Sequence, residues 1–189
     1  MSNNTMASQT NEQFDKIISS CLHTFIQKTA DYGTSWRVYR TISVADQIYI
    51  KAKRIRTIQE LKVQKIGDDI KSEFTGIINY CVIGLIQLQI NDEANEQIPA
   101  NEVEQYYTDI INKAKQLMND KNHDYGEAWR DMSQESFTDL ILAKILRIKQ
   151  IISNEGKTLT SEGIDANYFD MLNYAVFALI LMNEGNHNL

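Results

Sequence analysis

Two cations and three oxygen-bearing side chains recur at helical spacing in the C-terminal third of the chain. Lys144 and Arg147 are three residues apart, so a helix would place both on one face. Paired cations of this kind suit a phosphate chain or an acidic partner helix. Glu162, Asp170 and Asn173 project within about a quarter turn of one another at 3.6 residues per turn, and all three could reach one ion. These residues predict a site that holds a metal ion beside a phosphate group.

Both groups also have a simpler interpretation. Lysine and arginine on one helix face are often only a solvated surface, and an acidic protein brings carboxylates together by chance. What favours a functional interpretation is repetition, because charged surface positions are usually free to diverge. Five charged residues of this region have identical counterparts elsewhere in the same chain: Asp124, Arg130, Asp139, Lys144 and Arg147.

The repetition covers most of the chain. The stretch "DYGEAWR" at 124–130 matches "DYGTSWR" at 31–37, a spacing of 93 residues. Without a gap, residues 31–58 agree with 124–151 at 12 of 28 positions, where ordinary residue usage predicts roughly two. The match resumes at a spacing of 94, for example at Asn79/Asn173 and Tyr80/Tyr174. The sequence is therefore a tandem duplication.

Each copy has the pattern of three helices. Apolar residues recur every three or four positions, and one proline and eight glycines are few for 189 residues, so an all-α fold is predicted. The expected helices are 11–29, 43–62, 69–91, 101–121, 136–153 and 162–183. We expect an unstructured tail at 1–10, a first repeat at 11–96 and a second at 97–189, with Pro99 in the polar linker.

The third helix of each copy is apolar on all sides, so neither copy can cover it alone. The two repeats should pack face to face as one helical bundle with pseudo-twofold symmetry. In the repeated turn, Gly33 and Gly126 are expected in the left-handed conformation that ends a helix. Trp36 and Trp129 should pack into the core.

Composition restricts the class of partner. A formal charge of −6 and a pI near 5.1 argue against a protein that binds nucleic acid through a broad basic surface. The apolar runs are interrupted by Asn79 and Asn173 and are too short for a bilayer, so no membrane partner is expected. Cys21 and Cys81 lie in apolar contexts typical of buried free thiols, and the start of the chain lacks a secretory signal. A cytoplasmic location is predicted.

These motifs carry a family resemblance. The runs "KNHDYGEAWR", "SFTDLILAKILRIKQI" and "SEGIDANYFDMLNYAVFALI", with their first-copy partners, resemble the nucleotide modification associated domain 1 family in a duplicated form. In helical layout that family is similar to the MazG-like pyrophosphohydrolases and the dimeric dUTPases, which hydrolyse nucleoside triphosphates with magnesium held by carboxylates. The resemblance implies a role in nucleotide metabolism.

Carried onto this chain, the resemblance implies a magnesium ion held by acids and amides of the second copy. The implied ligands are Glu162, Asp170, Asn173, Asp139 and Asp124. Three cations, Lys144, Arg147 and Arg130, would take the negative charge that develops on the phosphates. The family's "K..DYG" motif also includes Lys121.

The first copy departs from this pattern, because Gly76 stands where the second copy has Asp170. Chemistry is therefore expected to centre on the second copy. The alternative is a non-catalytic nucleotide-binding or assembly module on a hydrolase-like scaffold. Either function predicts a nucleotide or another phosphate-bearing small molecule as partner, and a second copy of the chain is a further candidate partner.

Overall fold

The computed structural model describes residues 3–65, 67, 69–90, 97–160 and 162–186. Over these ranges the chain is helical and contains no strand, so the predicted all-α class is confirmed. The six helices are α1 (Asn3–Tyr32), α2 (Thr41–Leu61), α3 (Ile70–Gln89), α4 (Ala100–Tyr125), α5 (Gln134–Ser153) and α6 (Ile164–Asn183). A short 3-10 helix follows the first helix of each repeat: η1 (Ser35–Val38) and η2 (Ala128–Asp131).

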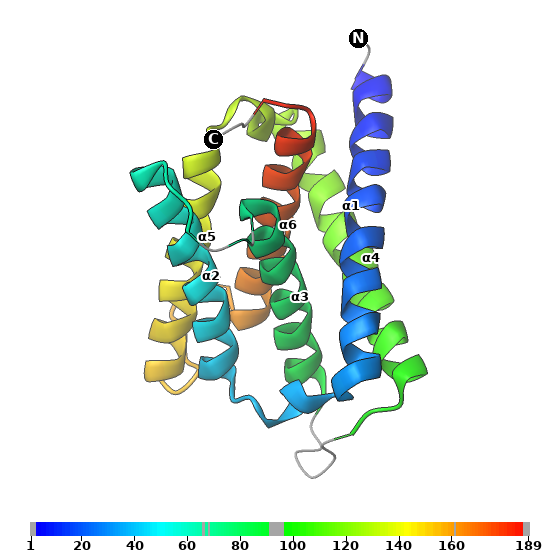
Figure 1. The fold of residues 1–189 in the computed structure, drawn as a ribbon, viewed down its shortest axis with the longest axis vertical. Helices are drawn as coiled ribbons and strands as arrows, with labels where there is room; N and C mark the ends of the chain where they lie inside the picture. The colour runs from blue at the N-terminus through cyan, green and yellow to red at the C-terminus, as the bar shows by residue number, and fades with distance from the viewer. Residues whose placement is uncertain (1–2, 66, 68, 91–96, 161, 187–189) are drawn as a thin grey trace.

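The helices form three layers of two (Figure 1). The apolar helices α3 and α6 make the central layer, with α2 and α5 on one side and α1 and α4 on the other. Every residue of 167–181 except Tyr174 is buried, as a helix with apolar residues all round requires. Each of the three layers pairs a helix with its own counterpart from the other repeat.

In the described part of the chain, no helix has the length and apolar character needed to cross a bilayer.

The α2–α5 layer shows how the repeats are related. Asp46 of α2 forms an ion pair of 2.6 Å with Lys149 of α5. Asp139 of α5 forms the reciprocal pair, at 3.5 Å, with Arg56 of α2. Asp46 and Asp139 are counterparts at the 93-residue spacing, and so are Arg56 and Lys149. Reciprocal contacts of this kind are what a twofold relation produces, consistent with two three-helix repeats packed around a pseudo-twofold axis.

A second pair of equivalent contacts fixes the first helix of each repeat to the third. Asn79 donates its side-chain amide to the carbonyl of Cys21 at 3.1 Å, and Asn173 donates to the carbonyl of Ala114 at 3.1 Å. Cys21 and Ala114 are themselves 93 residues apart. The repeated asparagine is therefore explained by helix packing.

The start of the chain differs from the prediction. Residues 1–10 were expected to be unstructured, but α1 already begins at Asn3. No glycine or proline interrupts residues 3–32, so nothing in this stretch stops the helix. Thr10 is buried and donates a hydrogen bond of 2.8 Å to Glu127 of the second repeat. Contact with the other repeat explains order in a segment that has no apolar pattern of its own.

The repeated turn has the predicted form. Gly33 and Gly126 have φ of +60° and +62°, and the N–H of each donates to the carbonyl four residues earlier, closing the helix. Trp36 and Trp129 are both buried. The ring of Trp129 stacks on Phe177, with 4.2 Å between centroids. The turn therefore ends a helix and inserts an indole beside the central layer.

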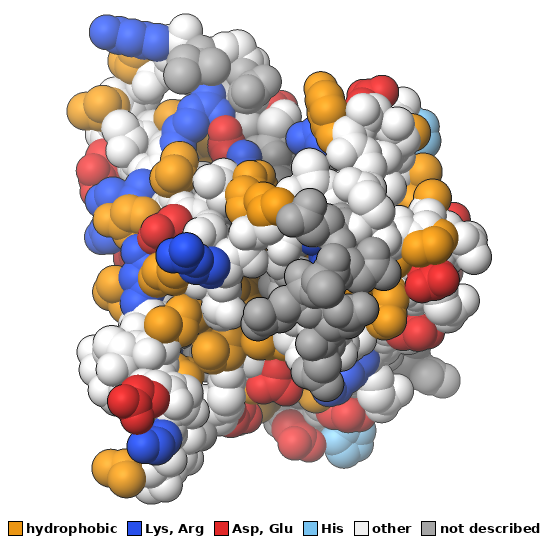
Figure 2. Space-filling view, turned by 90° about the horizontal axis from the view of Figure 1, so that it is seen from below, with side chains coloured by type: hydrophobic (Ala, Val, Ile, Leu, Met, Phe, Trp, Pro, Cys, Tyr) orange, Lys and Arg blue, Asp and Glu red, His pale blue; other side chains and the backbone are white. Residues whose placement is uncertain are grey.

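The molecular surface mixes charges of both signs. Figure 2, which shows the fold from below relative to Figure 1, has basic and acidic side chains interspersed among the described residues of that face. This distribution agrees with the acidic net charge of the chain.

Candidate functional site

The acid at the centre of the predicted site is engaged by two lysines. Asp170 of α6 is 8% exposed, and its two carboxylate oxygens accept hydrogen bonds of 2.5 Å from Lys121 of α4 and Lys144 of α5. Burial raises the pKa of Asp170, but the hydrogen bonds and charges of the lysines lower it by more, so the net shift is downward. Asp170 is therefore an internal counter-ion for two cations.

Of the other predicted metal ligands, Asn173, Asp139 and Asp124 face other partners. The amide nitrogen of Asn173 is bound to a main-chain carbonyl, as described above. Asp139 is 57% exposed and pairs with Arg56, and Asp124 is 75% exposed and lies 3.1 Å from His123. Glu162 was expected on the last helix but precedes it, exposed, because α6 begins at Ile164. Its charge nevertheless helps raise the pKa of Lys121, the lysine of α4 that binds Asp170.

This arrangement does not fit the predicted magnesium site. Among the described residues, no group of three or more histidine, cysteine, aspartate or glutamate side chains could hold a metal ion. Helical projection placed these residues on one face, but it could not show that neighbouring helices supply lysines to Asp170. We therefore derive no step through a metal at these five residues.

The predicted cations divide into two groups. Lys144 contacts Asp170, and Arg147, exposed on the next turn of α5, lies near enough to Tyr174 that its charge acts on this tyrosine together with those of Asp170 and Lys121. Arg130 of η2 lies over the ring of Trp129 at 4.4 Å and forms ion pairs with Glu127 at 2.7 Å and Glu184 at 3.0 Å. Its guanidinium also donates to Thr10 and Gln13 of α1. Arg130 therefore connects the repeats.

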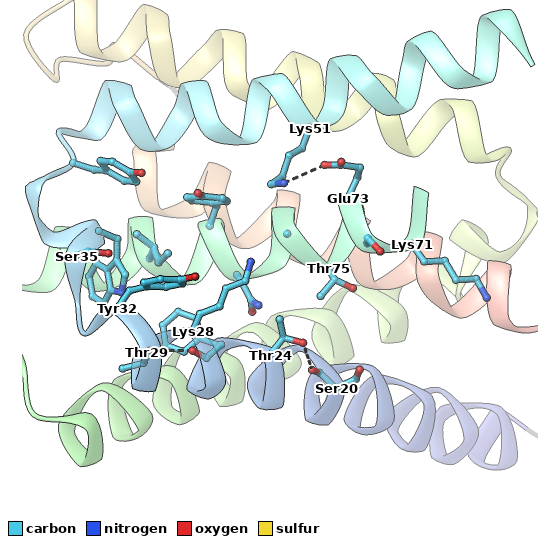
Figure 3. Close-up of a pocket in the computed structure, with 18 of the residues that line it drawn as sticks. Ser20, Thr24, Lys28, Thr29, Tyr32, Ser35, Lys51, Lys71, Glu73 and Thr75 are labelled. Atoms are coloured by element: carbon cyan, nitrogen blue, oxygen red, sulfur yellow. Dashed lines mark hydrogen bonds and ion pairs between the residues drawn. The ribbon is translucent and has the colours of Figure 1, made fainter. Parts of the chain in front are cut away.

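The first repeat contains a pocket of about 620 Å³ between α1, η1, α2 and α3. Figure 3 shows Lys28 of α1 and Lys51 of α2 pointing into it from opposite sides. Lys71, at the start of α3, lies toward one end, and Tyr32 and Ser35 lie toward the other. Hydroxyl and aromatic side chains complete the lining, including Ser20, Thr24, Thr75, Trp36, Tyr39 and Tyr80.

The pocket therefore has an aromatic part and a basic part. Tyr32 comes from the end of α1 and Trp36 from η1, Tyr39 directly follows η1, and Tyr80 comes from α3. Burial is the main cause that raises the pKa of Tyr80, and the neighbouring Tyr39 adds to the shift. An aromatic surface next to lysines is suited to a ligand with a flat ring and a phosphate group.

Comparison with known proteins adds one finding. The family model described as nucleotide modification associated domain 1 matches residues 28–88 and again 121–182. The chain belongs to this family. The two matched segments begin 93 residues apart, in agreement with the duplication. No curated protein and no solved structure matches the chain significantly, so the comparisons show no likeness to the MazG-like enzymes. The family's description gives the chain a nucleotide-related role.

In this member of the nucleotide modification associated domain 1 family, the two repeats place their acids one helical turn apart. The first repeat has Gly76 at the position of Asp170, but Glu73, three residues earlier, is buried and pairs with Arg54 and, at 3.1 Å, with Lys51. The sequence comparison missed Glu73 because its own counterpart is Asn167. A search for acids three residues away on the same helix face would have found it.

Gly76 makes room for the side chain of Lys51. A Cβ at this glycine would lie 2.7 Å from Cε and 3.0 Å from Nζ of Lys51. The prediction that this family member concentrates its chemistry in the second copy is not supported by the packing. The second repeat fills the position with Asp170, and the pocket lies in the first.

Two polar groups in the pocket lack the partners that their second-repeat counterparts have. Lys28 corresponds to Lys121 but forms no hydrogen bond or ion pair within the described ranges. The buried indole nitrogen of Trp36 has no hydrogen-bond partner among the described residues, whereas that of Trp129 donates to Asn122 at 3.1 Å. Thr29 stands at the position of Asn122 and donates to the Phe25 carbonyl.

Proposed function

We propose that the first-repeat pocket binds a nucleotide. The observation that supports this most directly is the combination of aromatic side chains and lysines around one pocket in a chain of a nucleotide-related family. A volume of about 620 Å³ is within the range of small-molecule sites. The pocket is built on helix termini and helix faces, which hold side chains more precisely than free loops.

The side chains suit the parts of a nucleotide. Tyr32, Tyr39 and Tyr80 offer ring faces to a base, and stacking on an aromatic is worth about 1–3 kcal/mol per base in single-stranded nucleic-acid complexes. Lys28 and Lys51 offer charged donors to phosphate oxygens. Hydroxyls of the lining, such as Thr24 and Thr75, are donors and acceptors for sugar oxygens.

The acids in the pocket are already engaged by other partners, and Lys28 is left available to a ligand. Asp69 accepts hydrogen bonds from the N–H and hydroxyl of Ser72 and so caps α3. The hydrogen bond from this N–H is the main cause that lowers the pKa of Asp69. Glu73 is held by Lys51 and Arg54. Lys28 remains as a cation that faces the pocket without an internal counter-ion among the described residues.

Hydrolysis is a further step that binding does not require. The five predicted magnesium ligands do not converge, so we assign no metal-dependent reaction, and binding is the function that the side chains support best. A screen of canonical and modified nucleoside triphosphates for released pyrophosphate, with and without magnesium, tests hydrolysis separately.

Calorimetric titration with nucleoside mono-, di- and triphosphates tests the proposed binding. Tyr32 and Tyr125 form a matched pair of counterparts, 69% and 74% exposed, of which only Tyr32 lines the pocket. Tyr32→Ala should weaken binding on the order of tenfold by loss of stacking, and Tyr125→Ala should leave it unchanged. Absence of binding by every nucleotide, or equal losses in the two variants, would refute the proposal.

A further inference from the structure

The second repeat shows what the counterparts of Lys28 and Lys51 bind. Lys121 and Lys144 reach from two different helices to one carboxylate, each at 2.5 Å, and that carboxylate belongs to a third helix. Charge-assisted bonds to both oxygens make this a tight clamp on an anion. The anion is supplied by the protein itself, as Asp170.

The first repeat has the same two lysines without the carboxylate. Lys28 and Lys51 are the counterparts of Lys121 and Lys144, and Gly76 is the counterpart of Asp170. The short distance from a Cβ at Gly76 to the amine of Lys51 shows that an acid here would meet this lysine directly. Figure 3 shows the two lysines directed into the same pocket from α1 and α2. Lys51 is paired with Glu73 from the preceding turn of α3, whereas Lys28 has no internal anion among the described residues.

We propose that the position beside Gly76, between Lys28 and Lys51, is an anion-binding site for a phosphate group of the ligand. In the second repeat, Asp170 occupies the equivalent site permanently. Because the Lys51 side chain itself lies against Gly76, the anion in the first repeat would lie at the amine ends of Lys28 and Lys51, beside the position that corresponds to Asp170. The assignment of this anion to a nucleotide rests on the proposed function, whereas the anion site itself does not.

The electrostatics of the first repeat favour this site despite two nearby acids, Glu73 and Asp69. Glu73 shares Lys51 with the proposed anion but is also bound by Arg54, and Asp69 lies near the charges of Arg54 and Lys71. Four cations, Lys28, Lys51, Lys71 and Arg54, therefore face two carboxylates, which leaves the cluster positive before a ligand binds. The indole nitrogen of Trp36, another residue of the pocket lining, is also buried without a hydrogen-bond partner among the described residues.

Titration of the full chain with inorganic pyrophosphate, followed by amide resonances in ¹H–¹⁵N spectra, tests the site. In the natural sequence, shifts should concentrate in residues 24–29 and 75–80 and not in their counterparts at 117–122 and 169–174. Gly76→Asp should weaken pyrophosphate binding on the order of tenfold or more, because the protein then supplies its own anion. Asp170→Gly should add a second set of shifts in the second repeat and raise the stoichiometry from one to two.

Lys28→Gln, a change at an exposed residue, measures the first-repeat site independently if Gly76→Asp folds poorly. Folded Gly76→Asp or Lys28→Gln protein that binds pyrophosphate as tightly as the natural chain would overturn the proposal. A folded Asp170→Gly variant with no second site would overturn the assignment of Asp170 as a built-in occupant.

The same experiment separates this inference from the proposed function. If Gly76→Asp removes pyrophosphate binding but the natural chain binds no nucleotide, nucleotide binding is refuted and the anion site is retained. If Gly76→Asp and Lys28→Gln leave the nucleotide affinity unchanged, the anion site is refuted and the proposed function is retained.

Discussion

The hydroxyl of Tyr107 on α4 donates a hydrogen bond of 2.9 Å to the side-chain oxygen of Asn79 on α3. A residue of the second repeat thus satisfies a buried amide oxygen of the first. The equivalent oxygen, on Asn173, is buried without a hydrogen-bond partner in the described part of the chain. At the 93-residue spacing the counterpart of Tyr107 is Phe14, which has no hydroxyl.

Phe14→Tyr should therefore stabilise the protein. The added hydroxyl reaches the unsatisfied oxygen of Asn173 by the same geometry that joins Tyr107 to Asn79, and one such bond is worth about 0.5–1.5 kcal/mol. Tyr107→Phe should lower the free energy of unfolding by about 1–3 kcal/mol, because it leaves Asn79 unsatisfied. Urea unfolding of the two variants measures both effects. Destabilisation by Phe14→Tyr would show that the two positions are not equivalent.

Asp170→Asn should act mainly on stability. It removes the charge that holds Lys121 and Lys144, of which Lys144 is nearly buried, and should cost about 1–3 kcal/mol. Thermal unfolding and nucleotide binding, measured on the same preparation, separate the effects. Lost nucleotide binding with an unchanged melting temperature would return Asp170 to the role predicted from the sequence.

The Asp170 contribution should depend on pH in one direction. The folded state lowers the pKa of this carboxyl below its ordinary value of 3.8. A group that binds its proton more weakly when folded stabilises the fold above its unfolded-state pKa, and this stabilisation is lost as the pH falls through the folded-state pKa. The stability difference between the natural chain and Asp170→Asn should be constant from about pH 6 to 8 and shrink below 3.8. Denaturant titrations across this range measure it, and a difference that grew on acidification would contradict it.

Asp139→Asn should lower the free energy of unfolding only by the small amount that a surface ion pair contributes. The partner Arg56 is 42% exposed, so the loss should be under about 1 kcal/mol. A double-mutant cycle with Arg56→Gln measures the coupling, and Asp46 with Lys149 supplies the matched pair from the reciprocal contact. A loss of magnesium-dependent activity in Asp139→Asn, without a loss of stability, would reinstate it as a metal ligand.

Replacement of the two turn glycines by alanine should lower the free energy of unfolding by unequal amounts. At Gly126 a Cβ meets no atom within 4 Å, so only the left-handed backbone opposes the change, at about 1 kcal/mol. At Gly33 a Cβ would also lie 2.7 Å from the side-chain oxygen of Gln97. Gly33→Ala should therefore be the more destabilising in chemical unfolding. Equal losses would indicate that Gln97 moves aside at no cost.

Sequence reasoning predicted the parts of this protein that depend on local pattern. Apolar periodicity gave the helices, and the repeated glycine gave the left-handed turn at Gly33 and Gly126. The internal alignment also indicated which residues are equivalent, and that equivalence explains the reciprocal pairs of Asp46 and Asp139. These features follow from spacing along one helix or between two copies.

The site depends on contacts between helices, which spacing does not specify. Asp170 was predicted as a metal ligand because the spacing of residues along α6 does not show the amines that neutralise it, which come from α4 and α5. Gly76 looked like a lost acid because Glu73 had moved by one turn, and a position-by-position alignment does not register such a shift. The aromatic side of the pocket was missed because Tyr39 and Tyr80 meet only after η1 folds back toward α3.

The reciprocal contacts across the α2–α5 layer are those of a dimer of identical chains, yet here one polypeptide supplies both halves. In a homodimer every substitution appears twice, so a glycine that opens one cleft would open the other as well. Covalent fusion removes that constraint. One half can then have a glycine where the other keeps its carboxylate, and the unaltered half continues to support the fold that the altered half needs.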